Sequence, residues 1–129
     1  MEYLCYVANA SLTLRLVEYL LKLPQLRVSF VTVINTVDGW VVRIRLKHLL
    51  SPTEDGNLRA ILNELRISYL PPKRVQLALW SLAGGVSPVD VMRRYQVTVV
   101  SHGKPEKEEI EAFRQHFIRE LGYCPQTLA

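Results

Sequence analysis

Residues 26–48 place two alternating segments on either side of Asp38-Gly39, and this pattern constrains the fold more than any other part of the chain. Asp-Gly is a favoured central pair of a two-residue hairpin turn, because a type I′ turn needs positive φ angles at both positions. The flanking residues alternate as half-buried strands do. The sequence therefore predicts an antiparallel hairpin over residues 26–48 that turns at Asp38-Gly39, with Val37 opposite Trp40. A longer turn starting at Thr36 would shift the register and change this pairing.

Strand alternation gives the predicted hairpin two different faces. The first is apolar except for Asn35, and we expect it in the core. It carries Val31, Val33, Val37, Trp40, Val42, Ile44 and Leu46. The second mixes aromatic, aliphatic, hydroxyl and cationic side chains. It carries Phe30, Thr32, Ile34, Thr36, Val41, Arg43, Arg45 and Lys47. An aromatic ring beside cations can stack on bases and hold phosphates, although a solvated outer face or one half covered by a helix would look the same.

Phe30, Ile34 and Val41 are the apolar side chains of the second face. Leaving a large apolar side chain bare forfeits roughly 1.5–3 kcal/mol of burial free energy. We therefore expect the last helix, a second copy of the chain or a ligand to cover them. Coverage by the last helix would bring Phe113 and Phe117 onto this face and remove it as a binding surface.

The first half of the chain alternates strands and helices around this hairpin. Residues 3–8 are nearly all apolar, which indicates a buried strand, and a helix follows with Leu16 and Leu20 in its apolar stripe. The segment from Ser51 to Glu54 fits a capping box with proline at the first helical position, so a second helix is expected to begin there, or at Asn57 because Gly56 interrupts the segment. The resulting order, β-α-β-β-α, is the start of a ferredoxin-like arrangement.

The second half is predicted to be mostly helical. Helices are expected over residues 73–83, 88–95 and 106–121, and residues 96–101 are rich in β-branched side chains that favour a fourth strand. Ile110, Phe113, Phe117 and Leu121 form the apolar stripe of the last helix. We thus predict a single α+β domain over residues 1–129, in which helices pack on a small antiparallel or mixed sheet. Residues 71–73 are the one candidate boundary.

Residues 75–98 resemble the opening of a helix-turn-helix motif, with two helices joined by a short turn at Gly85. The resemblance ends where a recognition helix would begin. Val99 and Val100 are β-branched, and Gly103 and Pro105 interrupt the segment that follows. A helical hairpin that returns to a strand is therefore the favoured interpretation.

The chain carries 16 Lys and Arg against 12 Asp and Glu, a formal net charge of +4. A basic excess of this size modestly favours a polyanionic partner. The candidate nucleic-acid-binding residues are the hairpin's Phe30, Arg43, Arg45 and Lys47, with Lys73, Arg74, Arg93 and Arg94 as a second basic group.

No pattern in the sequence predicts catalytic residues, a metal site or a cofactor. The histidines, His48, His102 and His116, are not at metal-ligand spacing, and no phosphate-binding glycine motif is present. Cys5 and Cys124 form no disulfide framework, which indicates a reducing, cytoplasmic compartment, although a bridge between them stays open. No signal peptide is evident and no apolar run approaches the roughly 20 residues of a membrane span, so we expect no membrane partner.

We therefore expect a non-enzymatic binding protein whose partner is nucleic acid, DNA included. The alternative is a protein-interaction or self-associating subunit, such as a homodimer, that uses the same hairpin face. A third option is a small enzyme with a cleft near His102, at the end of a predicted strand. Trp80 lies off the apolar stripe of its helix. We expect it in the core, whereas an exposed position would favour a protein interface.

Overall fold

The computed structural model describes residues 2–22, 28–68 and 71–129. Within these residues, four strands form one antiparallel sheet in the order β1-β3-β2-β4. They are β1 (Glu2–Val7), β2 (Val28–Thr36), β3 (Gly39–Leu46) and β4 (Thr98–Gly103). β1 and β2 both run antiparallel to β3, which lies between them, so β1, α1 and β2 form a split βαβ unit. β4 adds to the other edge of β2.

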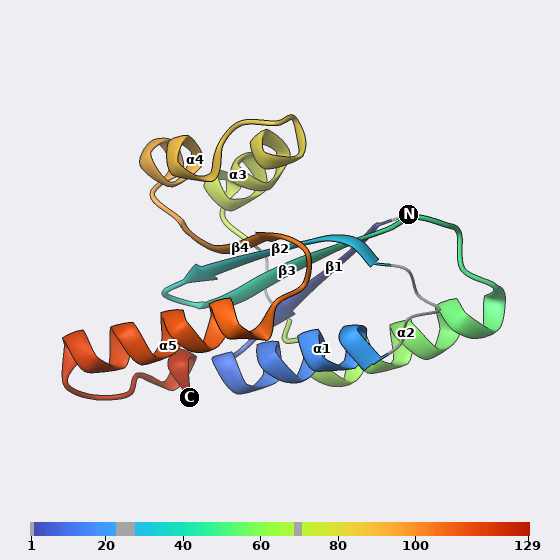
Figure 1. The fold of residues 1–129 in the computed structure, drawn as a ribbon, viewed down its shortest axis with the longest axis horizontal. Coiled ribbons are helices and arrows are strands. Elements are labelled where there is room, and N and C mark those ends of the chain that lie inside the picture. The colour runs from blue at the N-terminus through green and yellow to red at the C-terminus, as the bar shows by residue number, and fades with distance from the viewer. Residues whose placement is uncertain (1, 23–27, 69–70) are drawn as a thin grey trace.

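Helices cover both faces of this sheet (Figure 1). On one face lie α1 (Ala10–Lys22), α2 (Pro52–Leu65) and α5 (Lys107–Leu121), with the short 3₁₀ helix η2 (Gln126–Leu128) after α5. On the opposite face lie α3 (Lys73–Ala83) and α4 (Pro88–Tyr95). The α+β class, the antiparallel sheet and the helical second half are thus confirmed. β4 begins at Thr98, where a recognition helix would have to start, so α3 and α4 are a helical hairpin that returns to a strand.

The hairpin is confirmed, but its turn lies one residue earlier than predicted. Val37 and Asp38 form the turn, Thr36 pairs with Gly39, and residues 26 and 27 lie outside the described residues. The hydroxyl of Thr36 accepts the Asp38 N–H at 3.3 Å and donates to the Gly39 carbonyl at 3.1 Å, which closes the turn locally. Gly39 opens β3 with a φ of +151°, and a Cβ there would lie 2.8 Å from the Val7 carbonyl oxygen. Glycine therefore serves close strand packing rather than the turn.

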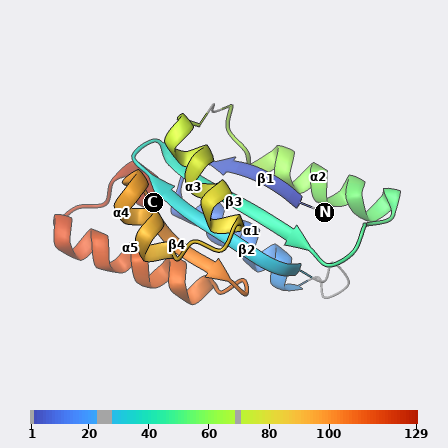
Figure 2. The ribbon, with the colours of Figure 1, turned by 90° about the horizontal axis from the view of Figure 1, so that it is seen from above.

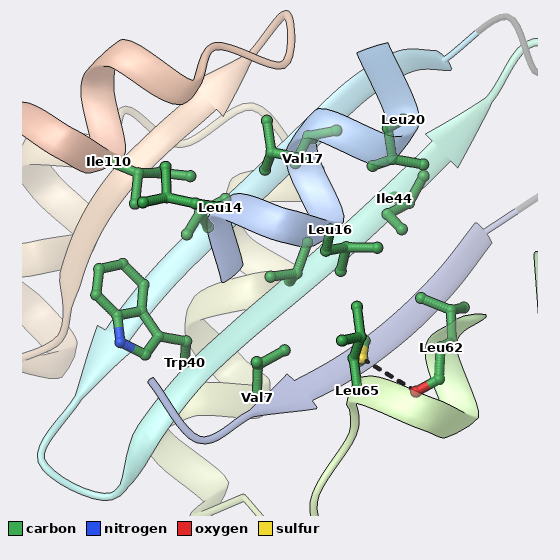
Figure 3. Close-up of a cluster of buried hydrophobic side chains, with 14 of the residues drawn as sticks. Val7, Leu14, Leu16, Val17, Leu20, Trp40, Ile44, Leu62, Leu65 and Ile110 are labelled. Atoms are coloured by element: carbon green, nitrogen blue, oxygen red, sulfur yellow. Dashed lines mark hydrogen bonds between the residues drawn. The ribbon is translucent and has the colours of Figure 1, made fainter. Parts of the chain in front are cut away.

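Because the turn begins one residue earlier, each residue of β2 pairs with a residue of β3 two positions away from the expected partner. Side chains alternate between the faces with a period of two, so each strand residue keeps its predicted face. The first face is buried at Val31, Val33, Trp40, Val42, Ile44 and Leu46. Val37 was wrongly predicted for the core, because it lies in the turn and is 84% exposed. Side chains of α1 and α5, including Leu16, Val17 and Ile110, pack onto this face (Figure 3).

The second hairpin face is half covered by helices, which was one of the alternatives, but the covering helices are α3 and α4 rather than the last helix. Ile34 and Val41 are fully buried against Val75 and Leu79 of α3 and Val91 of α4. The expectation that the last helix, a second copy or a ligand covers them is wrong, because the helical hairpin that follows Pro72 folds back over the sheet. α5 lies on the opposite side.

The apolar stripe of α5 is only partly buried. Ile110 is inaccessible to solvent, and Phe113 packs edge-on against Trp40 with ring centroids 5.5 Å apart. Phe117 and Leu121, one and two turns later, are 38% and 45% exposed. The helix therefore extends beyond the sheet that buries its first half, as Figure 1 shows.

Candidate functional site

α3 and α4 cover the half of the sheet that contains the β2–β3 turn and leave the other half of that face bare (Figure 2). Strand register places two rows of neighbouring side chains on this bare half, which we call the open platform. It consists of Leu4, Arg43, Thr32 and His102 in one row and Glu2, Arg45 and Phe30 in the next. The platform thus joins residues from all the strands of the described sheet.

Arg43 ties the platform to the helix layer. Its side chain is half-buried, and its Nη1 donates a hydrogen bond of 2.8 Å to the Leu79 carbonyl oxygen of α3. Burial lowers the pKa of Arg43 from its usual value. A guanidinium nevertheless stays protonated in proteins. The platform therefore holds a fixed positive charge that is less hydrated than a fully exposed one.

Arg45 lies two residues further along β3 and is paired with Glu2. Its Nε and Nη2 donate to the same Glu2 carboxylate oxygen at 3.0 and 2.8 Å. Both side chains are close to half exposed, at 45% and 47%. An exposed pair of this kind contributes about 0.2–1 kcal/mol, so an incoming anion can compete for Arg45.

His102 packs into the platform beside Thr32 and Phe30. Its Nδ1 lies 2.8 Å from the Thr32 hydroxyl oxygen, and its ring meets the Phe30 ring edge-on at 4.4 Å between centroids. Burial, and then the positive charges of Arg43 and Arg45, lower the pKa of His102 below its ordinary value. The imidazole is therefore neutral at pH 7 and feels a positive field.

The pair formed by Thr32 and His102 is poorly placed for catalysis. The Thr32 side chain lies beneath its neighbours, and the residue is 1% exposed. A nucleophile must reach its substrate, so burial shields this hydroxyl. The arrangement instead fixes the imidazole ring in one orientation.

A groove of about 400 Å³ borders the platform between β1 and α3. Its lining residues are Glu2, Tyr3, Leu4, Tyr6, Arg43, Gln76, Leu79 and Trp80. Trp80 was wrongly expected in the core, since it is 75% exposed on the groove's α3 side, a position that favours an interface. It lies off the stripe of α3 that packs on the sheet, and no other element of the described chain covers it.

The structure unites only part of the predicted binding set. Phe30, Arg43 and Arg45 lie together, and Lys47 is exposed in the bend that follows β3. The second basic group is exposed but lies on other elements, with Lys73 and Arg74 in the first turn of α3 and Arg93 and Arg94 in the last turn of α4. α4 covers the opposite half of the face, so Arg93 and Arg94 lie apart from the platform (Figure 2).

Sequence reasoning missed Glu2, Leu4 and Trp80 as neighbours of the hairpin cations, and it considered His102 only as part of a separate cleft. Each of these residues comes from a segment distant from β3 in the chain. Their proximity depends on which sheet edge β1 and β4 occupy and on where α3 packs on the sheet. Local alternation carries no signal for either.

The two cysteines do not form a disulfide. Cys5 and Cys124 are both free thiols; Cys5 is buried, and burial raises its pKa to about 11. No group of three or more potential metal ligands occurs among the described residues. In the same part of the chain, no helix is both long and apolar enough to cross a membrane.

Comparisons with known proteins give no family for the chain: no family model matches it, and no curated protein or solved structure shows significant similarity.

Proposed function

We propose that this protein binds nucleic acid through the open platform. The observation that carries the proposal is the juxtaposition of Arg43 and Arg45 on one face of β3 with the ring of Phe30 beside them. Side chains two residues apart on a strand are about 7 Å apart and point the same way. Cations on a sheet face can hold successive phosphates while an aromatic side chain stacks with a base.

The charge distribution supports this proposal over a protein partner on the same face. Ile34 and Val41 are already buried by α3 and α4, so two of the three apolar side chains of the hairpin face are not available for self-association. The bare half presents the guanidinium groups of Arg43 and Arg45 beside a single carboxylate, Glu2, and the half-exposed Leu4. A polyanion is the ligand class that matches this surface.

The test measures binding of a labelled oligothymidylate of about 12 nucleotides, a length within the usual site size, at several salt concentrations. Affinity of the parent protein should fall linearly with salt on a log-log scale. In the double variant Arg43→Gln/Arg45→Gln, the slope should decrease by about 1.4, because each phosphate contact to a single strand contributes about 0.7.

The matched control is Arg93→Gln/Arg94→Gln, which removes the same charge from α4. It should leave the salt slope close to that of the parent. Because Arg43 donates a hydrogen bond to α3, thermal melts of each variant check that the fold is intact. The single variant Arg45→Gln tests one phosphate contact at an exposed position that does not contact α3. The proposal would be refuted if the parent protein does not bind at low salt, or if both double variants lose the same amount of salt slope.

A further inference from the structure

We infer that the groove between β1 and α3 accepts one unstacked base of a single-stranded nucleic acid, so that the ligand class is single strands rather than duplexes. The inference rests on the proposed function and deepens it. Its basis is the position of the groove, which shares Arg43, Leu4 and Glu2 with the open platform. A strand whose phosphates contact the platform therefore passes the mouth of the groove.

The groove offers a base an aromatic wall and an apolar floor. Trp80 and Gln76 lie one turn apart on α3 and so line the groove from the same side. Trp80 is 75% exposed, and Leu4 across from it is 45% exposed. Exposed aromatic side chains of this kind provide stacking surfaces for bases of any sequence, because every base has a π face.

Arg43 supplies the charge at the point where groove and platform meet. Its hydrogen bond to Leu79 uses one of five guanidinium N–H donors, and no second hydrogen bond or ion pair of Arg43 is found within the described chain. The remaining donors can therefore hold a phosphate oxygen. A nucleotide bound there has its phosphate on the platform and its base within reach of Trp80.

The shape of the groove favours a single strand. Its volume of about 400 Å³ opens widely to solvent, so a strand can approach along its length. A base inside a duplex is stacked and paired, and it reaches such a groove only after extrusion, which costs a few kcal/mol. A base in a single strand avoids most of this cost.

The protein carries a convenient optical probe for this contact. Trp40 is 1% exposed in the core, whereas Trp80 is largely solvated. Stacking of a base on Trp80 should quench its fluorescence, and Trp40 should be unaffected. Titration of the full chain with the oligothymidylate should therefore quench the parent, and Trp80→Phe should lose that response while still binding.

Affinity provides the second readout. Trp80→Ala should bind the oligothymidylate roughly 5- to 150-fold more weakly, the range that loss of one stacked base gives. Tyr123→Ala is the matched control, because Tyr123 is an aromatic residue with 63% exposure outside the groove, and its affinity should equal that of the parent. A duplex with the same number of phosphates should bind more weakly than the single strand and leave Trp80 unquenched.

Three results would overturn the inference. They are unchanged affinity in Trp80→Ala, equal binding and quenching by the duplex, and quenching of Trp80 by protein concentration alone, which would indicate a second copy in the groove. In each case the proposed function stands if Arg45→Gln still weakens binding. If the parent binds neither nucleic acid, both proposals fail.

Discussion

Replacing Glu2 with glutamine should tighten nucleic-acid binding by about fivefold. The carboxylate of Glu2 accepts both hydrogen bonds that Arg45 makes within the platform, at 3.0 and 2.8 Å. A phosphate that engages Arg45 must compete with this exposed pair, which contributes about 0.2–1 kcal/mol. At about 6 Å in water, repulsion between the carboxylate and the phosphate adds about 0.7 kcal/mol before screening by salt. Together these terms give roughly 1 kcal/mol, or about fivefold in affinity.

The assay is the anisotropy titration with oligothymidylate at low salt, and the matched control is Glu64→Gln. Glu64 also pairs with an exposed arginine, Arg15, at 4.0 Å, but it lies on α2 on the far side of the sheet. Both variants gain one unit of net charge, so a general electrostatic effect would strengthen both equally. If Glu2→Gln binds no more tightly than Glu64→Gln, the argument that Arg45 contacts phosphate is refuted.

Two further predictions follow from the geometry. Burial and the two arginines lower the pKa of His102 in the folded protein below 6.5, its value in the unfolded chain. Between these two pKa values the unfolded chain binds more protons, so the free energy of unfolding, measured by urea titration, should rise with pH. His102→Gln should flatten this rise, and an unchanged slope in that variant would contradict the prediction. Gly39→Ala should destabilise the fold by about 1–3 kcal/mol, because it adds a Cβ against the Val7 carbonyl at a φ of +151°. Gly56 lies in α2 with open space around it, so Gly56→Ala should stabilise the fold by about 0.5–1 kcal/mol. Equal effects of the two alanines would contradict the close-approach argument.

The local elements were predictable because each carries its own signal. Strand alternation gave both hairpin faces correctly, and the capping box at Ser51 is present, with the Glu54 N–H donating to the Ser51 hydroxyl at 3.2 Å. The turn was misplaced by one residue because Asp-Gly satisfies a turn preference, while Gly39 is needed for the approach of Val7 in β1. That requirement comes from tertiary packing, which the local pattern does not contain.

The candidate site was less predictable than the fold. Phe30, Arg43 and Arg45 share a face by alternation alone, so the sequence identified them together. The positions of His102 and Trp80 depend on the pairing of β4 with β2 and on the position of α3 beside β1. These are long-range choices. The same packing of helices on the sheet decides which half of the hairpin face stays exposed. It therefore also decides which of the predicted cations lie close enough to contact one ligand.

The most direct test of the central claim is a heteronuclear NMR titration of the whole chain with the oligothymidylate at low salt. We expect the largest amide and side-chain shift changes on the open platform and the adjoining groove, at Leu4, Arg43, Arg45, His102 and Trp80. Resonances of α4 and of the opposite helix layer should stay close to their free positions. Absence of shift changes, or changes centred on Arg93 and Arg94 instead, would contradict the claim that this protein binds nucleic acid through the open platform.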